Sequence, residues 1–247
     1  MRIGEIRYQL SANPAFSAVK NFYRVTGGET LLQLTCEGVL CDMDGVLIDS
    51  TECVRRHWEE WARRHSIEMD RIMRIAHGQR PVETMQAVAP HLDVVREAEA
   101  FTALELADTE GIVALEGARE FLQSLQGARW GIVTSASRDL ALARLAAAGL
   151  PVPPVLVSGD DVARGKPAPD PYREGVKRLG CAAHACVAIE DAPAGIQSAS
   201  AAGLHVIAVA STHPKHALDG SIIVDSLSVL KVIQNKSTAS LLIVAAT

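Results

Sequence analysis

The stretch that decides the fold is GVLCDMDGVLIDS, residues 38–50. It begins with apolar residues, and two aspartates, Asp42 and Asp44, follow two positions apart. Aspartate is a poor strand residue, and a buried carboxylate is costly unless it is paired. This pattern indicates a buried strand whose end carries a polar site. Gly45 permits a sharp turn directly afterwards, so that both carboxyl groups can face the same place.

Short apolar runs like this one recur along the chain and predict further buried strands. The expected strands are residues 39–41 (or 34–41, if the strand starts at Leu34), 131–134, 155–157, 187–189 and 206–209. Helical segments lie between them at residues 138–148 and 171–179, and each is followed by a glycine that ends it. Strands that alternate with helices predict a parallel sheet covered on both faces. The expected fold class is α/β, with a doubly wound, Rossmann-like parallel sheet.

One region interrupts the alternation between strands and helices. It shows apolar residues at helical spacing, such as Val54, Trp58 and Trp61, and no convincing strand. We therefore expect an inserted all-α helical cap domain. The expected division is an N-terminal extension of unassigned role (residues 1–31), an α/β core (32–49 and 117–230), the helical cap (50–116) and a C-terminal tail (231–247). The tail contains SLLIVAAT, which is either an extra strand or a loose apolar end.

The composition limits the class of protein. Hydrophobic residues make up 48% and charged residues 21%, which is ordinary for a globular protein. The net charge of −5 argues against a nucleic-acid partner. The chain has no run of about 18 uncharged apolar residues and no signal-peptide pattern at its start, so we expect no membrane span and a cytoplasmic location. The five cysteines have irregular spacing that fits neither a disulfide framework nor a zinc site.

Polar side chains follow the predicted strands at the end where open parallel sheets bind ligands. They are Asp42 and Asp44 after the first strand, Thr134 and Ser135 after the second, Lys166 in RGKPAPDPY, and Glu190 and Asp191 in IEDAPAG. Several carboxylates in one pocket repel each other unless a cation neutralises them, and oxygen ligands of this kind suit Mg²⁺. The lysine and the hydroxyls leave donors for an anion, so the set predicts a phosphate ligand. In such a site an aspartate can act as the nucleophile and a second aspartate as the general acid and base.

Each of these elements alone has a simpler explanation. The two aspartates with Gly45 fit a local turn, Lys166 fits a solvated surface charge, and Glu190 with Asp191 fits a helix cap. The stretch GDDVARGK is not a phosphate-binding loop, because its spacing is one residue too long and Pro167 replaces the required Ser or Thr. The prediction rests on the order and the strand-end position of the whole set.

Four segments of the chain resemble the motifs of the haloacid dehalogenase superfamily. They are DMDGVLIDS, VTSAS, GKPAPDPY and IEDAPAGIQSASAAG, and the resemblance covers residues 37–227. The resemblance implies that Asp42 is the nucleophile and Asp44 the general acid and base. It also implies that Ser135 and Thr134 bind the phosphoryl group, and that Lys166 contacts both the phosphate and Asp42. The implied Mg²⁺ site consists of Asp42, Asp44, Glu190 and Asp191. The helical insertion lies where the family has its small helical cap.

The resemblance also narrows the reaction. Asp44 argues against dehalogenases and phosphonatases, which lack this second aspartate. The β-phosphoglucomutase-like members carry a histidine ten residues further on, where this chain has Val54, and His57 is three residues beyond. A phosphatase is therefore expected, and a phosphomutase is the alternative. A catalytically silent phosphosugar-binding protein is a third reading, from a different class.

The cap segment HGQRPVETM, residues 77–85, resembles a segment of sugar- and polyol-phosphate phosphatases. On this basis Gly78, Gln79, Arg80 and Glu83 are expected to bind substrate; otherwise Arg80 is a surface charge and Gly78 a helix break. We expect an Mg²⁺-dependent phosphatase that hydrolyses a small phosphorylated sugar or polyol through an aspartyl-phosphate intermediate. The expected oligomeric state is a monomer or a weak dimer.

Overall fold

The computed structural model describes residues 22–26, 29–218, 222–235 and 240–246. Its centre is a six-stranded parallel sheet in the order β10-β9-β8-β3-β6-β7. The strands are β3 (Gly38–Cys41), β6 (Trp130–Val133), β7 (Val155–Val157), β8 (Cys186–Glu190), β9 (His205–Val209) and β10 (Ile222–Val224). The predicted fold class is confirmed, and β10 is a strand that the sequence reading did not include.

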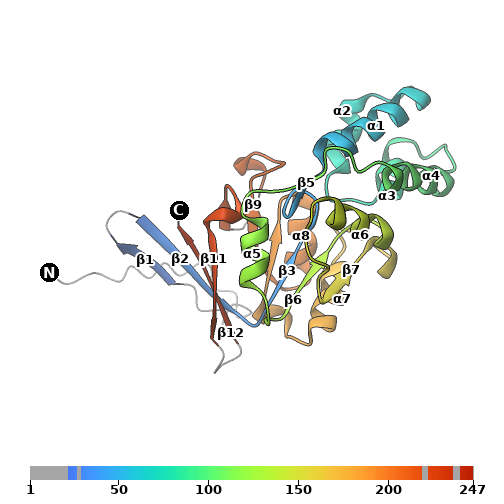
Figure 1. Cartoon of the computed structure of the whole chain (residues 1–247). Coiled ribbons are helices and arrows are strands. Elements are labelled where there is room, and N and C mark those ends of the chain that lie inside the picture. The colour runs from blue at the N-terminus through green and yellow to red at the C-terminus, as the bar shows by residue number, and fades with distance from the viewer. Residues whose placement is uncertain (1–21, 27–28, 219–221, 236–239, 247) are drawn as a thin grey trace.

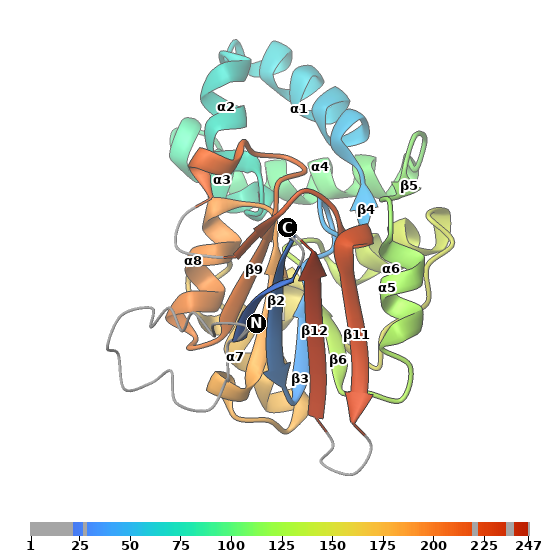
Figure 2. The same ribbon diagram turned by 90° about the vertical axis from the view of Figure 1, so that its left-hand side faces the viewer.

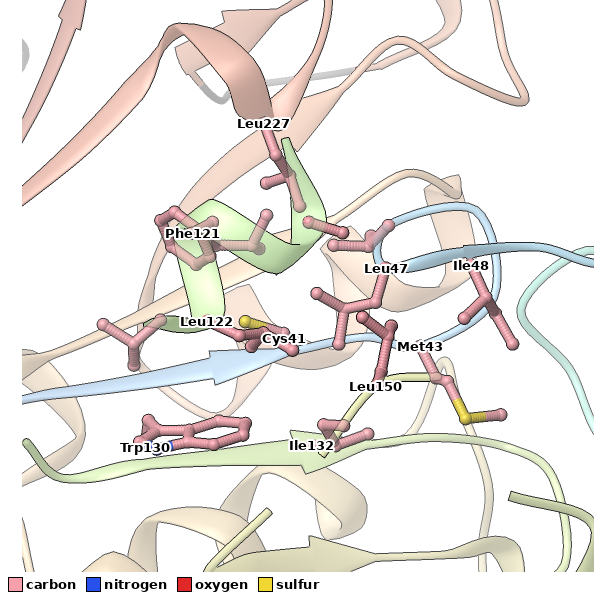
Figure 3. Packing of buried hydrophobic residues seen from close by; sticks show 14 of the residues in the cluster. Cys41, Met43, Leu47, Ile48, Phe121, Leu122, Trp130, Ile132, Leu150 and Leu227 are labelled. Atoms are coloured by element: carbon pink, nitrogen blue, oxygen red, sulfur yellow. The ribbon is translucent and has the colours of Figure 1, made fainter. Parts of the chain in front are cut away.

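Helices cover both faces of this sheet, and the side chains of each strand alternate between them. The helices are α5 (Ala118–Ser124), α6 (Arg138–Ala147), α7 (Asp170–Leu179) and α8 (Pro193–Ala201), and the short 3-10 helices are η2 (Gly159–Asp161), η3 (Ala183–Ala185), η4 (Lys215–Ala217) and η5 (Leu227–Val229). Cys41 belongs to the hydrophobic cluster that contains Phe121 of α5, and Figure 3 shows this packing. Leu40 belongs to the cluster on the opposite face, with Tyr172 of α7. This alternation holds β3, and the residues that follow it, rigidly in the middle of the molecule.

The helical insertion, called the cap below, lies over the carboxyl edge of the parallel sheet (Figure 1). Its helices are α1 (Thr51–His65), α2 (Met69–Ala76), α3 (Pro81–Val88) and α4 (Val94–Ala107). Trp58 and Trp61 are buried in its own apolar cluster with Phe101, whose ring centroid lies 4.4 Å from that of Trp58. The two chain connections to the cap pair as the antiparallel strands β4 (Ile48–Asp49) and β5 (Val113–Ala114). The expectation of no strand in this region was therefore wrong for β5, which is too short to show a periodic pattern.

A second, four-stranded antiparallel sheet joins the two ends of the described chain (Figure 2). Its strands, in the order β1-β2-β12-β11, are β1 (Phe22–Thr26), β2 (Glu29–Cys36), β12 (Ser240–Ala246) and β11 (Leu230–Asn235). Leu34, Leu241 and Ile243 of this sheet are buried in the same cluster as Phe121. The apolar tail is therefore a strand rather than a loose end.

This second sheet also corrects one strand boundary. The apolar residues from Leu34 do not extend β3, because they belong to β2, and a bend at Glu37 separates the two strands. Most of the predicted N-terminal extension, residues 1–21, lies outside the described residues. The division of the chain into domains stays a prediction. Within the described ranges, no helix combines the length and the apolar character that crossing a bilayer requires.

Candidate active site

The carboxyl edge of the parallel sheet brings the predicted site residues together. Asp42 directly follows β3, Thr134 follows β6, and Glu190 ends β8. The backbone N–H of Asp42 donates to the carbonyl of Ile189 at 2.8 Å, which continues the pairing of β3 with β8 past the end of the strand. These side chains are anchored by neighbouring strands rather than by mobile loops, which fixes their mutual positions.

Lys166 lies between two of the carboxylates. Its Nζ is 2.9 Å from Oδ1 of Asp42 and 2.6 Å from Oε1 of Glu190. Tyr172 donates its hydroxyl to the same Oε1 at 2.6 Å. Burial alone would lower the pKa of Lys166, but the charges of Asp42 and Glu190 outweigh it and hold that pKa above its usual value. The ammonium group is therefore charged, and it faces the carboxylate of Asp42.

The carboxylates at this edge carry more negative charge than one lysine compensates. Burial raises the pKa values of Asp42, Glu190 and Asp191 above the usual range, in spite of the nearby ammonium group. Asp191 accepts a hydrogen bond from Thr212 at Oδ2, while its buried Oδ1 has no hydrogen-bond partner among the residues that the structure describes. One oxygen atom from each of the three carboxylates lies within 4.8 Å of the others. This donor set fits a divalent cation, which would neutralise the charge and satisfy the unpaired oxygen.

A glycine is required where the chain turns beside Asp191. Gly45 has a φ angle of +80°, and a Cβ atom there would lie 2.1 Å from Oδ2 of Asp191. Both the backbone conformation and the close approach exclude a larger residue. The turn between Asp42 and the cap can therefore pass directly over the carboxylate cluster.

Asp44 has different partners from Asp42. Its Oδ1 accepts hydrogen bonds from the hydroxyl of Ser50 at 2.6 Å and from Nη1 of Arg144 at 3.0 Å. Arg144 also donates through Nη2 to Oε1 of Glu105, a cap residue, at 2.7 Å. The side chain of Asp44 is 28% exposed, whereas that of Asp42 is 5% exposed. The two aspartates of the first motif therefore lie in unlike environments.

A cavity of about 110 Å³ lies between the cap and the carboxyl edge of the sheet. Of the predicted residues, Asp42, Asp44, Thr134, Ser135, Asp191, Gly78 and Gln79 line it. Ser135 donates its hydroxyl to the carbonyl of Gly78 at 2.8 Å, so the cap contacts the loop that follows β6. Val54 also lines the cavity, whereas His57 lies outside the lining, with its Nε2 3.2 Å from Asp108.

Arg80 and Glu83, predicted to bind substrate, are not among the residues that line this cavity. Arg80 donates to the backbone carbonyls of Gly159 at 3.2 Å, Val162 at 3.1 Å and Ala163 at 3.1 Å. Glu83 accepts from the backbone N–H of Gly165 at 2.9 Å and from Nη2 of Arg80 at 2.6 Å. We call these contacts of Arg80 and Glu83 with residues 159–165 the clamp. The clamp attaches the cap to the loop that leads into Lys166.

Three residues of the site belong to none of the four motifs: Arg144, Glu105 and Thr212. One of them has a signal in the sequence. Arg144 lies on the buried face of α6, in register with Leu140 and Ala141 and next to Leu145. An arginine on the apolar face of an Ala-rich helix is an exception that points to a buried charged partner. The identity of that partner follows only from the three-dimensional structure.

The parallel sheet, the helical cap and the carboxylate-lysine cluster define a class of phosphate-handling α/β hydrolases. The sequence model of the haloacid dehalogenase-like hydrolase family matches residues 36–203 of this chain. The chain therefore belongs to this family. This confirms the resemblance inferred from the four motifs.

Relatives of known activity are similar over most of the chain. Hexitol phosphatase A of Escherichia coli (strain K12) is 44% identical over 181 residues, which cover 71% of this chain and 84% of that protein. Validoxylamine A 7'-phosphate phosphatase of Streptomyces hygroscopicus subsp. limoneus is 35% identical, covering 72% and 88% respectively. Among solved structures, a hydrolase from Pseudomonas syringae matches with a TM-score of 0.70 and 27% identity, covering 77% of this chain and 94% of that one.

Proposed function

We propose that this chain is a Mg²⁺-dependent phosphatase that hydrolyses a phosphate monoester of a small sugar or polyol. The observation that carries the proposal is the position of Asp42, which is buried at the base of the cavity with Lys166 at 2.9 Å. The relatives support the same reaction, since those described above act on a hexitol phosphate and on validoxylamine A 7'-phosphate by their names. A cytoplasmic location and a monomer or weak dimer remain predictions.

In the proposed mechanism the carboxylate of Asp42 attacks the phosphorus atom and forms an aspartyl phosphate. Lys166 binds the phosphoryl oxygens and holds Asp42 in place, and Thr134 and Ser135 donate to the same oxygens. Asp44 gives a proton to the leaving sugar oxygen, and then takes one from the water that hydrolyses the intermediate. Products are inorganic phosphate and the free sugar or polyol.

Asp42, Asp44 (through its backbone carbonyl), Glu190 and Asp191 are the proposed residues of the metal site. A bound Mg²⁺ would neutralise the charge of the phosphoryl group and of the carboxylates as they approach each other. The unpaired Oδ1 of Asp191 supports its assignment as a ligand. Glu190 also accepts hydrogen bonds from Lys166 and Tyr172, so it has a second role, which is to hold Lys166 in position.

Phosphate release from a panel of hexitol, hexose, glycerol and nucleoside monophosphates tests the proposal. Wild-type protein with Mg²⁺ is expected to release phosphate from the sugar or polyol esters, and Asp42→Asn to release none while keeping its fold. Full activity of Asp42→Asn would contradict the mechanism. A positional isomer formed without free phosphate would instead identify a phosphomutase, which Val54 in the cavity lining disfavours.

A further inference from the structure

Two charged side chains that line the cavity, Arg144 and Glu105, belong to none of the four motifs. Arg144 is 4% exposed, and among the described residues that line the cavity it is the single lysine or arginine. Its Nη1 donates to Asp44 at 3.0 Å and its Nη2 to Glu105 at 2.7 Å. Within the described part of the chain, the buried Nε of Arg144 has no hydrogen-bond partner. A buried donor without a partner is costly, which points to a ligand group that completes it.

The charge of Arg144 is already balanced by protein groups. Two acidic side chains, Asp44 and Glu105, flank one guanidinium, so the positive charge of Arg144 is already compensated on this side of the cavity. Two other arginines near the cap–core boundary are occupied elsewhere. Arg80 is held by the clamp, and Arg138 donates through Nη2 to the carbonyl of Leu156 and to Asp161. The described side chains therefore supply no spare lysine or arginine for a second anionic group in this part of the cavity.

We propose that Arg144 and Glu105 form a subsite that binds hydroxyl groups of the non-transferred part of the substrate and rejects a second phosphate. The proposal rests on the proposed phosphatase function and specifies its substrate class. A hydroxyl group can accept a hydrogen bond from Nε of Arg144 or donate one to a carboxylate oxygen of Glu105. Two neighbouring hydroxyl groups of a sugar or polyol can therefore pair with the arginine and with the glutamate. A second phosphate would carry about two negative charges next to Asp44 and Glu105, with no free cation to hold it.

The subsite contains residues from both halves of the protein. Arg144 comes from α6 of the core, whereas Glu105 comes from α4 of the cap. Thr102 of α4 also lines the cavity. The hydroxyl-binding group is therefore complete only while α4 lies against α6. A polyol chain that bridges Arg144 and Glu105 would stabilise this arrangement through contacts that a free phosphate ion cannot make.

Glu105→Gln tests the charge argument with little change of shape. The amide oxygen still accepts from Arg144, but one negative charge is removed. We expect the ratio of kcat/KM for a hexose 1,6-bisphosphate to kcat/KM for the matching 6-monophosphate to rise at least tenfold relative to wild type. Glu97→Gln is the matched control, because it removes the same charge from the same helix α4 but lies outside the cavity lining. Its ratio should equal that of wild type.

An unchanged ratio in Glu105→Gln, or an equal rise in Glu97→Gln, would overturn the subsite. If Glu105→Gln does not fold, the wild-type protein gives the answer. The inhibition constant of the bisphosphate should be at least tenfold higher than the dissociation constant of the monophosphate. Equal or tighter binding of the bisphosphate would overturn the proposal. Failure of the phosphatase function itself looks different, since the wild-type protein would then release no phosphate from any monophosphate.

Discussion

Gly165→Ala is expected to open the clamp between the cap and the loop that precedes Lys166. The φ angle of Gly165 is not in the left-handed region, so alanine fits the backbone. A Cβ atom there would lie 2.6 Å from Oε2 of Glu83 and 2.8 Å from Nε of Arg80. Both distances are too short for a carbon atom, so the two cap side chains must move away.

The size of the effect follows from the contact that is lost. The N–H of Gly165 donates to the carboxylate of Glu83 at 2.9 Å, and a hydrogen bond to a charged group contributes about 1.5–3 kcal/mol. Because both groups meet water when the cap opens, the lower value of about 1.5 kcal/mol applies. This corresponds to roughly a tenfold fall in kcat/KM if the closed form is the one that holds substrate.

A double-mutant cycle separates the clamp from a direct effect on Lys166, the next residue. Gly165→Ala is measured in wild type and in a background with Arg80→Ala and Glu83→Ala, using kcat and KM for a sugar phosphate. The fall should appear in wild type and be absent in the clamp-free background. Glu83 also accepts from the backbone N–H of Arg80 at the start of α3, so thermal unfolding is recorded for each variant.

Asp93→Ala is the control for helix capping in this cycle. Its side chain accepts from the N–H of Arg96 at the start of α4, and it takes no part in the clamp. It should lower stability without a tenfold change in kcat/KM. A loss caused by Gly165→Ala that persists at full size in the clamp-free background would refute the clamp. The displacement of Lys166 would then explain the loss.

Three further predictions concern stability. Hydrogen bonds from Arg178 outweigh the desolvation of Asp161 and hold its pKa well below the usual range; this stabilisation is present above the unfolded pKa of about 4. Asp161→Asn should therefore cost on the order of 2 kcal/mol at pH 7, and progressively less as the pH falls from about 4 toward the lowered pKa of the folded protein, measured by urea unfolding. A loss that stays constant down to about pH 2 would contradict this. Gly175→Ala should destabilise the protein by about 1–3 kcal/mol despite the better helix propensity of alanine, because its Cβ would lie 2.8 Å from Leu40; a higher Tm would refute it. Added Mg²⁺ should raise Tm more at pH 8 than at pH 6, because protons compete with the cation for carboxylates such as Asp191, and an equal rise would contradict the metal site.

Five strands of the parallel sheet, β3 and β6–β9, were predictable because each appears as a continuous, largely buried apolar run. The edge strand β10 is only partly buried and was missed. The antiparallel sheet was not, since β2 runs on toward β3 with only Glu37 between them. Its pairing with β12 joins residues from opposite ends of the chain, and no local pattern encodes such a pairing. The apolar character of the C-terminal tail indicated only that it could form an extra strand, and not which strand it would pair with.

The site shows the same limit. The residues after each strand, such as Asp42 and Lys166, were predictable because a rule of topology places strand ends at one edge. The contact of Arg144 with Glu105 joins α6 to α4, and the roles of Arg80 and Glu83 depend on where α3 lies on the core. These contacts depend on the position of the cap on the core. An arginine or a glutamate is equally suited to binding substrate and to joining the cap to the core, so the residue types alone do not distinguish the two roles.

The two aspartates of the opening stretch differ in which half of the protein holds them. The partners of Asp42 all come from the core, since Lys166 contacts it and Glu190 contacts that lysine. Asp44 is held by Ser50, at the entrance to the cap, and by Arg144, which is itself paired with Glu105 of α4. A movement of α4 away from the core would therefore remove a partner of Arg144 and leave the pair of Asp42 and Lys166 intact. It follows that the proposed nucleophile is organised by the core alone, whereas the arginine that contacts the proposed acid and base keeps both of its carboxylate partners only while α4 lies against α6.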